Sequence, residues 1–194
     1  MIDRDIFFNS IDKELGTEDR DRIEWAYSLA KYYHRPQVRD SGERYFEHCK
    51  SVAMILIEFA PTSPSEIIMG LLHDICEDQF VPRGMMRQLF GEKIDEGLKL
   101  LSNQKTIFRT MAKIEKIDRP KEEYFAMLMD APLGVRKVKL ADRLHNLKTL
   151  GECAPEKIKR KVAETEKYIF PLAKKTDSKL FEAIRKECKK FNTK

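Results

Sequence analysis

Histidine and carboxylate side chains recur along the sequence in a pattern that could hold a metal ion. His48 stands alone, His73 and Asp74 are adjacent, and Asp142 follows much later. Two neutral imidazoles and two carboxylates would balance the charge of a divalent cation. An ion that prefers octahedral coordination would keep positions open for water and for a substrate oxygen. The pattern therefore favours metal-assisted attack on a phosphate, because the ion lowers the pKa of bound water and offsets phosphate charge.

Two more carboxylates follow the His-Asp pair in a largely apolar stretch. Glu77 and Asp78 stand four residues after His73 and Asp74, so one continuous helix would place each carboxylate a turn along from its partner. Burying such groups without partners costs several kcal/mol, so compensating groups must meet them. A carboxylate one turn from a metal ligand can reach its water and act as a general base. The alternative for Glu77 is a carboxylate that only orients His73 or the bound water.

Polar residues at helical spacing also follow Asp142. His145, Asn146 and Thr149 stand three, four and seven residues after it, which puts all four on one face of a helix. Taken alone, Asp142 could instead form a surface ion pair with the adjacent Arg143. The combination of an acid, an imidazole, an amide and a hydroxyl on one face favours a site.

A third polar segment begins at Arg39 and ends at the isolated histidine. Ser41 and Gly42 predict a turn, and His48 then stands at the entrance of an apolar helix over about residues 52–59. By themselves, Arg39 could be a solvated loop charge and His48 a packed or surface histidine. Because the chain also contains the polar segments around His73 and Asp142, we favour the interpretation that Arg39 and His48 belong to the same site as those segments.

Taken together, the three segments resemble the hydrolase domain of RelA/SpoT-type alarmone enzymes, within the HD-domain phosphohydrolase superfamily. The matching motifs are Arg39-x-Ser41-Gly42-Glu43-x-Tyr45-x-x-His48, His73-Asp74-x-x-Glu77-Asp78 and Val138-Lys139-Leu140-Ala141-Asp142-Arg143-Leu144-His145-Asn146. The similarity runs from about residue 34 to residue 172. Because 194 residues leave no room for a synthetase domain, the chain looks like a stand-alone small alarmone hydrolase, the class that includes the metazoan SpoT homologues.

The resemblance implies an all-α fold, a single HD-type domain over residues 1–194, and removal of pyrophosphate from the ribose 3′ position of ppGpp or pppGpp. It implies Mn²⁺ as the cofactor, held by His48, His73, Asp74 and Asp142, with Glu77 and Asp78 as the catalytic pair. It implies substrate contacts by Arg39, which would stack on the guanine, by Asn146 and Thr149, which would bind the base or ribose, and by the motif residues Tyr45, Lys139 and Arg143. His34 and His145 fall within the same motifs, and we expect them to support the site without binding the metal.

Two departures from the family pattern keep a second substrate class open. Asp40 stands where the family usually has a basic residue, which makes the expected pocket less positive. Residues 103–131 also diverge from the well-known alarmone hydrolases, and we expect this segment to cover the site. The alternative is an HD phosphohydrolase that acts on another nucleotide, such as a deoxynucleotide or NADPH.

The elements that must position these residues are helices. Apolar residues repeat at helical spacing nearly throughout, and no stretch alternates convincingly as a strand would. Ser63-Pro64-Ser65-Glu66 predicts a capping box that starts a buried helix reaching about Cys76. Prolines at 82, 120, 132 and 155 mark further helix starts, so we expect about eight to ten helices in one bundle.

Composition narrows the class of protein further. The chain is 42% hydrophobic with 8 Gly and 8 Pro, which excludes disordered and collagen-like classes. No apolar run approaches the roughly 20 residues of a membrane span, and the first residues lack a signal-peptide pattern, so we expect a cytoplasmic protein. The four cysteines form no Cys-x-x-Cys pair, which favours reduced thiols.

The basic charge is concentrated at the C-terminal end. Residues 156–194 hold 13 Lys/Arg against 6 Asp/Glu, while residues 1–155 hold 24 against 26. A non-catalytic nucleic-acid-binding module is the third possible function, since such a tail could contact phosphate backbones. The tail lacks interleaved aromatic residues and has Ile158, Val162, Ile169 and Leu172 at helical spacing, so we expect amphipathic helices with a solvated basic face.

Overall fold

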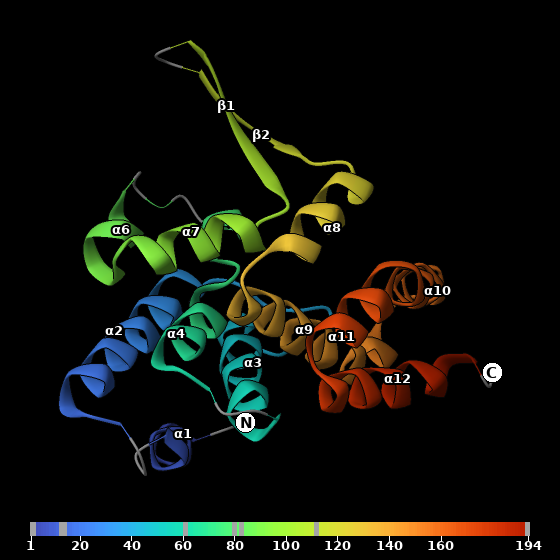
Figure 1. The fold of residues 1–194 in the computed structure, drawn as a ribbon, viewed down its shortest axis with the longest axis horizontal. Helices are drawn as coiled ribbons and strands as arrows, with labels where there is room; N and C mark the ends of the chain where they lie inside the picture. Colours follow the sequence, from blue (N-terminus) through green and yellow to red (C-terminus); the bar gives the residue numbers. More distant parts are fainter. Residues whose placement is uncertain are drawn as a thin grey trace.

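Helices make up almost all of the structure, which is a computed structural model (Figure 1). It describes residues 3–11, 15–59, 62–78, 81, 84–110 and 113–192, of which residues 78, 105–110, 113–115 and 192 are described by their backbone alone. The elements are α1 (Arg4–Ile11), α2 (Thr17–Tyr33), α3 (Tyr45–Phe59), α4 (Pro64–Leu72), α5 (Ile75–Asp78), α6 (Met85–Phe90), α7 (Glu92–Leu101), β1 (Gln104–Thr110), β2 (Lys113–Asp118), α8 (Lys121–Asp130), α9 (Leu133–Lys148), the 3-10 turn η1 (Leu150–Glu152), α10 (Pro155–Glu164), the π-turn η2 (Thr165–Ile169), α11 (Phe170–Thr176) and α12 (Ser178–Asn192). The all-α prediction is confirmed. The described residues contain more α-helices than expected, because α5 and α6 are short segments that the sequence pattern did not separate.

Helix α9 is the central element of the bundle. It packs against α3, α4, α7, α11 and α12, and it lies in the middle of the ribbon in Figure 1. Pro132 immediately precedes it, as predicted, and Val135, Val138, Ala141 and Leu144 are buried along it. Polar residues on this helix are therefore enclosed by protein and need partners there.

Helix α4 begins with the predicted capping box. The Ser63 hydroxyl accepts the Glu66 backbone N–H at 3.3 Å, and the Glu66 carboxylate accepts the Ser63 backbone N–H at 3.2 Å. Pro64 occupies the first turn, where its missing N–H costs nothing. Residues 67–72 follow as a fully buried helix, so this part of the prediction is confirmed.

The helix stops earlier than predicted, and this is a correction. It ends at Leu72, His73 and Asp74 form a turn, and α5 is a separate single turn. The His73 ring lies 2.9 Å through Nδ1 from the Gly70 carbonyl oxygen. In a continuous helix that carbonyl would accept the N–H of Asp74 alone, so the imidazole competes for it and favours the break. The expected stacking of Glu77 over His73 along one helix is therefore wrong.

Residues 104–110 and 113–118 form the two strands of an antiparallel hairpin, which the sequence analysis did not expect. Strands β1 and β2 pair antiparallel from Gln104 with Asp118 to Thr110 with Lys113, with a register shift between Phe108 and Thr110. The hairpin projects from the helical body, and only its base lies against the helices (Figure 1). The expectation that residues 103–131 cover the site is wrong for the projecting part of the ribbon, whereas Asn103, Lys121, Tyr124 and Phe125 of the same segment line a cavity with Glu77.

Helices α3 and α4 cross closely at a glycine. A Cβ built on Gly70 would lie 2.9 Å from Cδ1 of Leu56 and 3.4 Å from the backbone Cα of Ala53. The leucine side chain can shift, but the helix backbone behind it cannot. A side chain larger than Ala at position 70 would extend beyond this Cβ and would need the two helices to move apart.

A Gly70→Val variant is expected to lose about 2 kcal/mol of unfolding free energy, because overpacking a close crossing costs roughly 1–3 kcal/mol. Urea denaturation would measure the loss. Gly151→Val is the matched control, since nothing lies within 4 Å of a Cβ at that position. Equal losses in the two variants would mean that close packing at Gly70 is not the cause.

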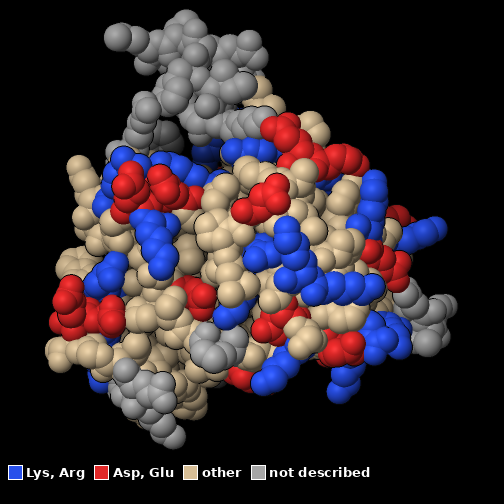
Figure 2. Space-filling view, viewed as in Figure 1, with Lys and Arg blue, Asp and Glu red and all other residues tan. Residues whose placement is uncertain are grey.

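The C-terminal helices are amphipathic, as predicted. Val162, Ile169 and Leu172 are buried and Ile158 is half-buried, so the apolar side of α10, η2 and α11 faces the core. On the face drawn in Figure 2, basic and acidic side chains are interspersed, and no large coloured area carries one sign. All four cysteines are free thiols. None of the helices in the described ranges is long and apolar enough to cross a membrane.

Candidate metal centre and adjoining cavities

Three of the expected ligands converge where α3 meets the turn after α4. Nε2 of His48 lies 3.2 Å from Nε2 of His73, and Nε2 of His73 lies 2.9 Å from Oδ2 of Asp74. That carboxylate oxygen is also 3.7 Å from Nε2 of His48. One ligand atom from each residue lies within 4.8 Å of the other two, so a single cation could bridge all three.

The fourth expected ligand reaches the same point from α9. Oδ1 of Asp142 lies 3.4 Å from Nε2 of His48 and 3.8 Å from Nε2 of His73. Its other oxygen accepts a hydrogen bond from the Lys139 ammonium at 3.0 Å, and the Asn146 amide donates to Oδ1. Three segments that are far apart in the sequence thus bring these four residues together in the fold.

The hydrogen bonds of His48 and His73 engage Nδ1 of each ring and leave Nε2 of each ring available to bind a metal. Nδ1 of His73 donates to the Gly70 carbonyl, which in the neutral ring leaves the lone pair on Nε2, inside the cluster. Nδ1 of His48 lies 2.8 Å from Nδ1 of His145. Burial, together with the neighbouring His48 and Arg39, lowers the pKa of His145 to about 3, so its neutral ring can accept the proton of His48 Nδ1. Nε2 of His48 then also points into the cluster as a lone pair.

The electrostatics of the cluster favour positive charge. Burial alone would lower the pKa of His73, but the carboxylates of Asp74 and Asp142 outweigh it and raise that pKa to about 9. Burial would raise the pKa of Asp74, but His73 and His48 hold it well below its usual value. Two nitrogen and two carboxylate donors in a cation-attracting field are the chemistry of a divalent-metal site, so the residues present fit such an ion.

An aromatic residue links the cluster to the histidine upstream of it. The Tyr45 hydroxyl donates to Oδ2 of Asp74 at 2.6 Å. The buried His34 ring stacks on the Tyr45 ring with a centroid distance of 4.9 Å. Tyr45 and His34 therefore help to position Asp74, one of the expected metal ligands, from outside the cluster.

Glu77 is held at the base of the hairpin. Its Oε1 accepts the backbone N–H of Asn103, and the Lys116 ammonium donates to the backbone carbonyl of Glu77 at 3.0 Å. Burial, followed by the charge of Asp74, raises the pKa of Glu77. A carboxylate with a raised pKa is a better proton acceptor, which suits a general base. The side chain of Asp78, the other expected catalytic residue, lies outside the described residues.

A cavity of about 420 Å³ borders the cluster on the side of Tyr45 and Asn146. Arg39 lies in its wall, where its guanidinium donates to Oδ1 of Asn146 at 2.8 Å and to the Thr149 hydroxyl at 3.3 Å. The guanidinium carbon is 5.8 Å from the centre of the Tyr45 ring. Arg39 is therefore part of a built wall and not a solvated loop charge, and the Asn146 amide is already shared between Asp142 and Arg39.

The basic tail contributes to this cavity, which the sequence analysis missed. Lys157, Arg160 and Lys161 of α10 line it together with Arg39 and Arg143. The expectation of a solvated basic face is thus wrong for this part of the tail. Helical spacing placed these cations on one side of a helix but could not tell that α10 folds back onto the site.

A second cavity of about 420 Å³ lies beside the first and shares its basic wall. Arg143, Arg160 and Lys161 line both, and Glu77 and Lys139 line the second. The two cavities thus have three cations in common, and the second cavity also contains the carboxylates of Glu77 and Glu164.

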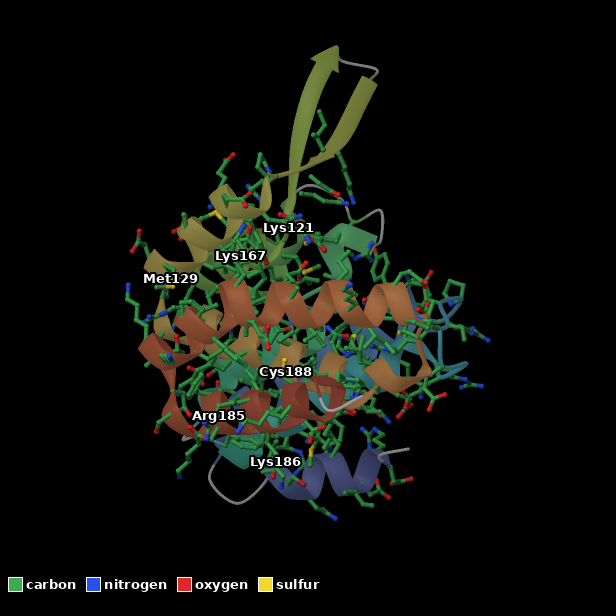
Figure 3. All side chains as sticks on the ribbon, turned by 90° about the vertical axis from the view of Figure 1, so that its right-hand side faces the viewer. Lys121, Met129, Lys167, Arg185, Lys186 and Cys188 are labelled. Carbon is green, nitrogen blue, oxygen red and sulfur yellow. The ribbon has the colours of Figure 1, made fainter. Side chains whose placement is uncertain are left out.

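The buried Glu164 holds three of the surrounding cations. It forms ion pairs with Arg143 and Lys121, and Lys161 lies 3.7 Å away. Figure 3 labels Lys121, near the junction of α8 with the C-terminal helices. The π-turn starts at the next residue, Thr165, whose hydroxyl also lies 3.5 Å from Arg143. Sequence reasoning did not single out Glu164, because a lone Glu in a basic segment resembles a solvated surface charge.

A Glu164→Gln variant is expected to lose about 3 kcal/mol of unfolding free energy at pH 7, since breaking a buried ion pair leaves an uncompensated charge. Burial alone would raise the pKa of Glu164, but Arg143 and Lys121 lower it to about 2, against 4.5 for an ordinary Glu. The stabilisation is therefore complete above pH 4.5 and is lost as the pH falls towards 2. Denaturation at pH 7 and pH 3 measures both effects, with Glu152→Gln at an exposed position as the control. Equal losses in the two variants would contradict the buried ion pairs.

Comparison with known proteins identifies the family. A sequence model of the HD domain matches residues 26–178. The chain is 36% identical over 155 residues to the bifunctional (p)ppGpp synthase/hydrolase SpoT of Escherichia coli, covering 78% of this chain and 21% of that protein. It is 35% identical over 164 residues to the guanosine-3′,5′-bis(diphosphate) 3′-pyrophosphohydrolase of Spiroplasma citri, covering 80% of this chain and 21% of that protein. The chain thus spans about a fifth of the length of these relatives.

A solved structure shares the fold across almost the whole chain. It is described as a metazoan orthologue of SpoT that hydrolyses ppGpp and plays a role in starvation responses. The TM-score is 0.75 at 18% sequence identity, covering 92% of this chain and 97% of the other. With the sequence match over most of its length, this chain belongs to the HD domain family.

Proposed function

We propose that this chain is a metal-dependent phosphohydrolase that removes pyrophosphate from the 3′ position of ppGpp or pppGpp, giving GDP or GTP. One observation carries the proposal: a cation-attracting cluster of two His and two Asp borders a cavity lined by five Lys/Arg residues and a single carboxylate. Such a lining suits a small molecule with several phosphates. The activities named for the bacterial relatives and the metazoan orthologue fit this chemistry.

The proposed cofactor is Mn²⁺, held by His48, His73, Asp74 and Asp142. Mixed nitrogen and oxygen donors suit this ion, and when bound it would acidify water and offset phosphate charge. The choice of Mn²⁺ over other divalent ions rests on the family resemblance.

The surrounding side chains then have separate tasks. We assign Glu77, with Asp78, to accept the proton of the attacking water and to assist the leaving 3′ oxygen. Arg39 and Thr149 would receive the base, with Asn146 fixing the Arg39 guanidinium. Tyr45 and Lys139 orient the carboxylates of Asp74 and Asp142, respectively.

The phosphates would meet the basic wall shared by the two cavities. Arg143 lines both cavities, and its guanidinium donates to Glu164, which lines the second cavity. Because the guanidinium is held in place before substrate arrives, little side-chain entropy is lost on binding.

The test is incubation of the purified, Mn²⁺-loaded chain with ppGpp, followed by chromatography of the products. Stoichiometric GDP and pyrophosphate support the proposal, and unchanged ppGpp contradicts it. A parallel panel with NADPH and deoxynucleotides examines the alternative substrates. Faster turnover of one of these would mean that the chain is a metal-dependent phosphohydrolase with that nucleotide, and not ppGpp, as its preferred substrate.

A further inference from the structure

Asp40 and Lys157 come from two different segments of the chain and form a contact at the cavity that contains Arg39. Asp40 belongs to the loop before α3, and Lys157 belongs to α10. The ammonium of Lys157 donates to Oδ2 of Asp40 at 2.5 Å, and the thiol of Cys153 donates to the same oxygen at 3.5 Å. All three residues line the cavity, so this contact lies on its surface and not behind it.

Asp40 is the one carboxylate among the described residues that line this cavity, and it forms an ion pair with Lys157. Arg143 and Lys161 lie against Glu164, and Arg39 is held by neutral oxygens. Within the described ranges, Lys157 forms its ion pair with Asp40. The hydrogen bond from Lys157, reinforced by its charge, lowers the pKa of Asp40, so the carboxylate stays ionised.

The geometry makes this contact easy to exchange. Only one carboxylate oxygen takes part, and the two side chains are 54% (Asp40) and 39% (Lys157) exposed. Ion pairs this open to water contribute little to stability, because solvent screens them. A phosphate offers more oxygens and more charge than this carboxylate, so it can replace Asp40 as the partner of Lys157.

We propose that Lys157 is a phosphate ligand of this cavity and that Asp40 is an internal competitor that a bound phosphate displaces. The pair then sets the affinity for polyphosphates, since binding must first break it. The inference rests on the phosphate chemistry of the proposed function and names two specificity-determining residues for it.

The experiment measures binding of inorganic pyrophosphate to the metal-loaded chain by calorimetry, for the original chain, Asp40→Asn, Lys157→Met and the double variant. Asp40→Asn is expected to tighten binding about two- to fivefold, the size of a surface ion-pair effect. Lys157→Met is expected to weaken it about tenfold, because a charge-assisted hydrogen bond is lost. In the Lys157→Met background, Asp40→Asn should then have little effect.

Two outcomes would overturn the inference. If Asp40→Asn weakens binding, the pair holds the cavity wall in place and does not compete. If Asp40→Asn tightens pyrophosphate binding equally in the original chain and in the Lys157→Met background, the effect comes from removing a negative charge near the anion and not from freeing Lys157. Glu182→Gln is the matched control for long-range charge, since it removes the same charge from an exposed pair with Arg185 on α12 (Figure 3). Because the readout is anion binding, it stays separate from whether ppGpp is hydrolysed.

Discussion

An Asp142→Ala variant is expected to lose metal binding and turnover together. The carboxylate lies 3.4 Å from His48 Nε2 and 3.8 Å from His73 Nε2, and its removal would also leave the Lys139 ammonium facing the cluster without its partner. Loss of a side chain that merely orients a ligand costs roughly 10- to 100-fold in metal affinity, so loss of a ligand should cost more than about 100-fold. Metal content after desalting and the initial rate with ppGpp measure the two effects.

Two further variants serve as controls for the Asp142→Ala experiment. Asp130→Ala removes the same group at a position where the side chain is 89% exposed, and it should keep full metal content. Asp142→Asn keeps the shape of the side chain, in case the alanine variant fails to fold. A folded Asp142→Ala protein with unchanged metal content would contradict both the metal site and the proposed function.

The site could be recognised from sequence because its residues come from short local motifs. His73 and Asp74 are adjacent, and Asn146 follows Asp142 by one helical turn, so local geometry alone brings each pair together. Where His48 lies relative to them depends on how α3, α4 and α9 pack, which spacing cannot specify. The family resemblance filled that gap by implying one shared site, and in the structure Nε2 of His48 lies 3.2 Å from Nε2 of His73 and 3.4 Å from Oδ1 of Asp142.

The errors in the fold have separate physical causes. The two strands project from the helical body, and a strand pair in that position need not follow the alternating apolar pattern of a sheet that packs one face on a core. Its β-branched and aromatic residues Thr106-Ile107-Phe108 were the available signal. The break at His73 depends on a side chain that competes for a backbone carbonyl, and periodicity does not record such competition.

The charge of the site also depends on tertiary structure. Residues 1–155 carry a net negative charge, which pointed to a poorly basic pocket, with Asp40 as the main concern. Helix α10 then returns to the site, where Lys157 neutralises Asp40 and Arg160 and Lys161 add positive charge. Charge summed along a chain therefore predicts little about a cavity whose walls come from distant segments.

A Glu77→Gln variant is expected to keep its metal and to lose about 10²- to 10⁴-fold in kcat, the usual contribution of a general base. Glutamine has nearly the same shape, and its side-chain oxygen can still accept the Asn103 N–H, so the position of the side chain should be preserved. Burial and the charge of Asp74 raise the pKa of Glu77, so the acid limb of the wild-type rate profile should lie above the ordinary value of 4.5. The variant should lack this limb. Measured kcat, metal content and the pH–rate profile test all three expectations.

The alternative role for Glu77, as a residue that orients His73, has little room in the structure. Nδ1 of His73 is engaged by the Gly70 carbonyl and Nε2 lies in the cluster, so neither ring nitrogen remains for the carboxylate. If Glu77 acted only by orienting a ligand, Glu77→Gln would lower metal affinity, and excess metal would restore kcat. If it is the base, excess metal restores nothing. Glu96→Gln, at a position 61% exposed, controls for the loss of one negative charge.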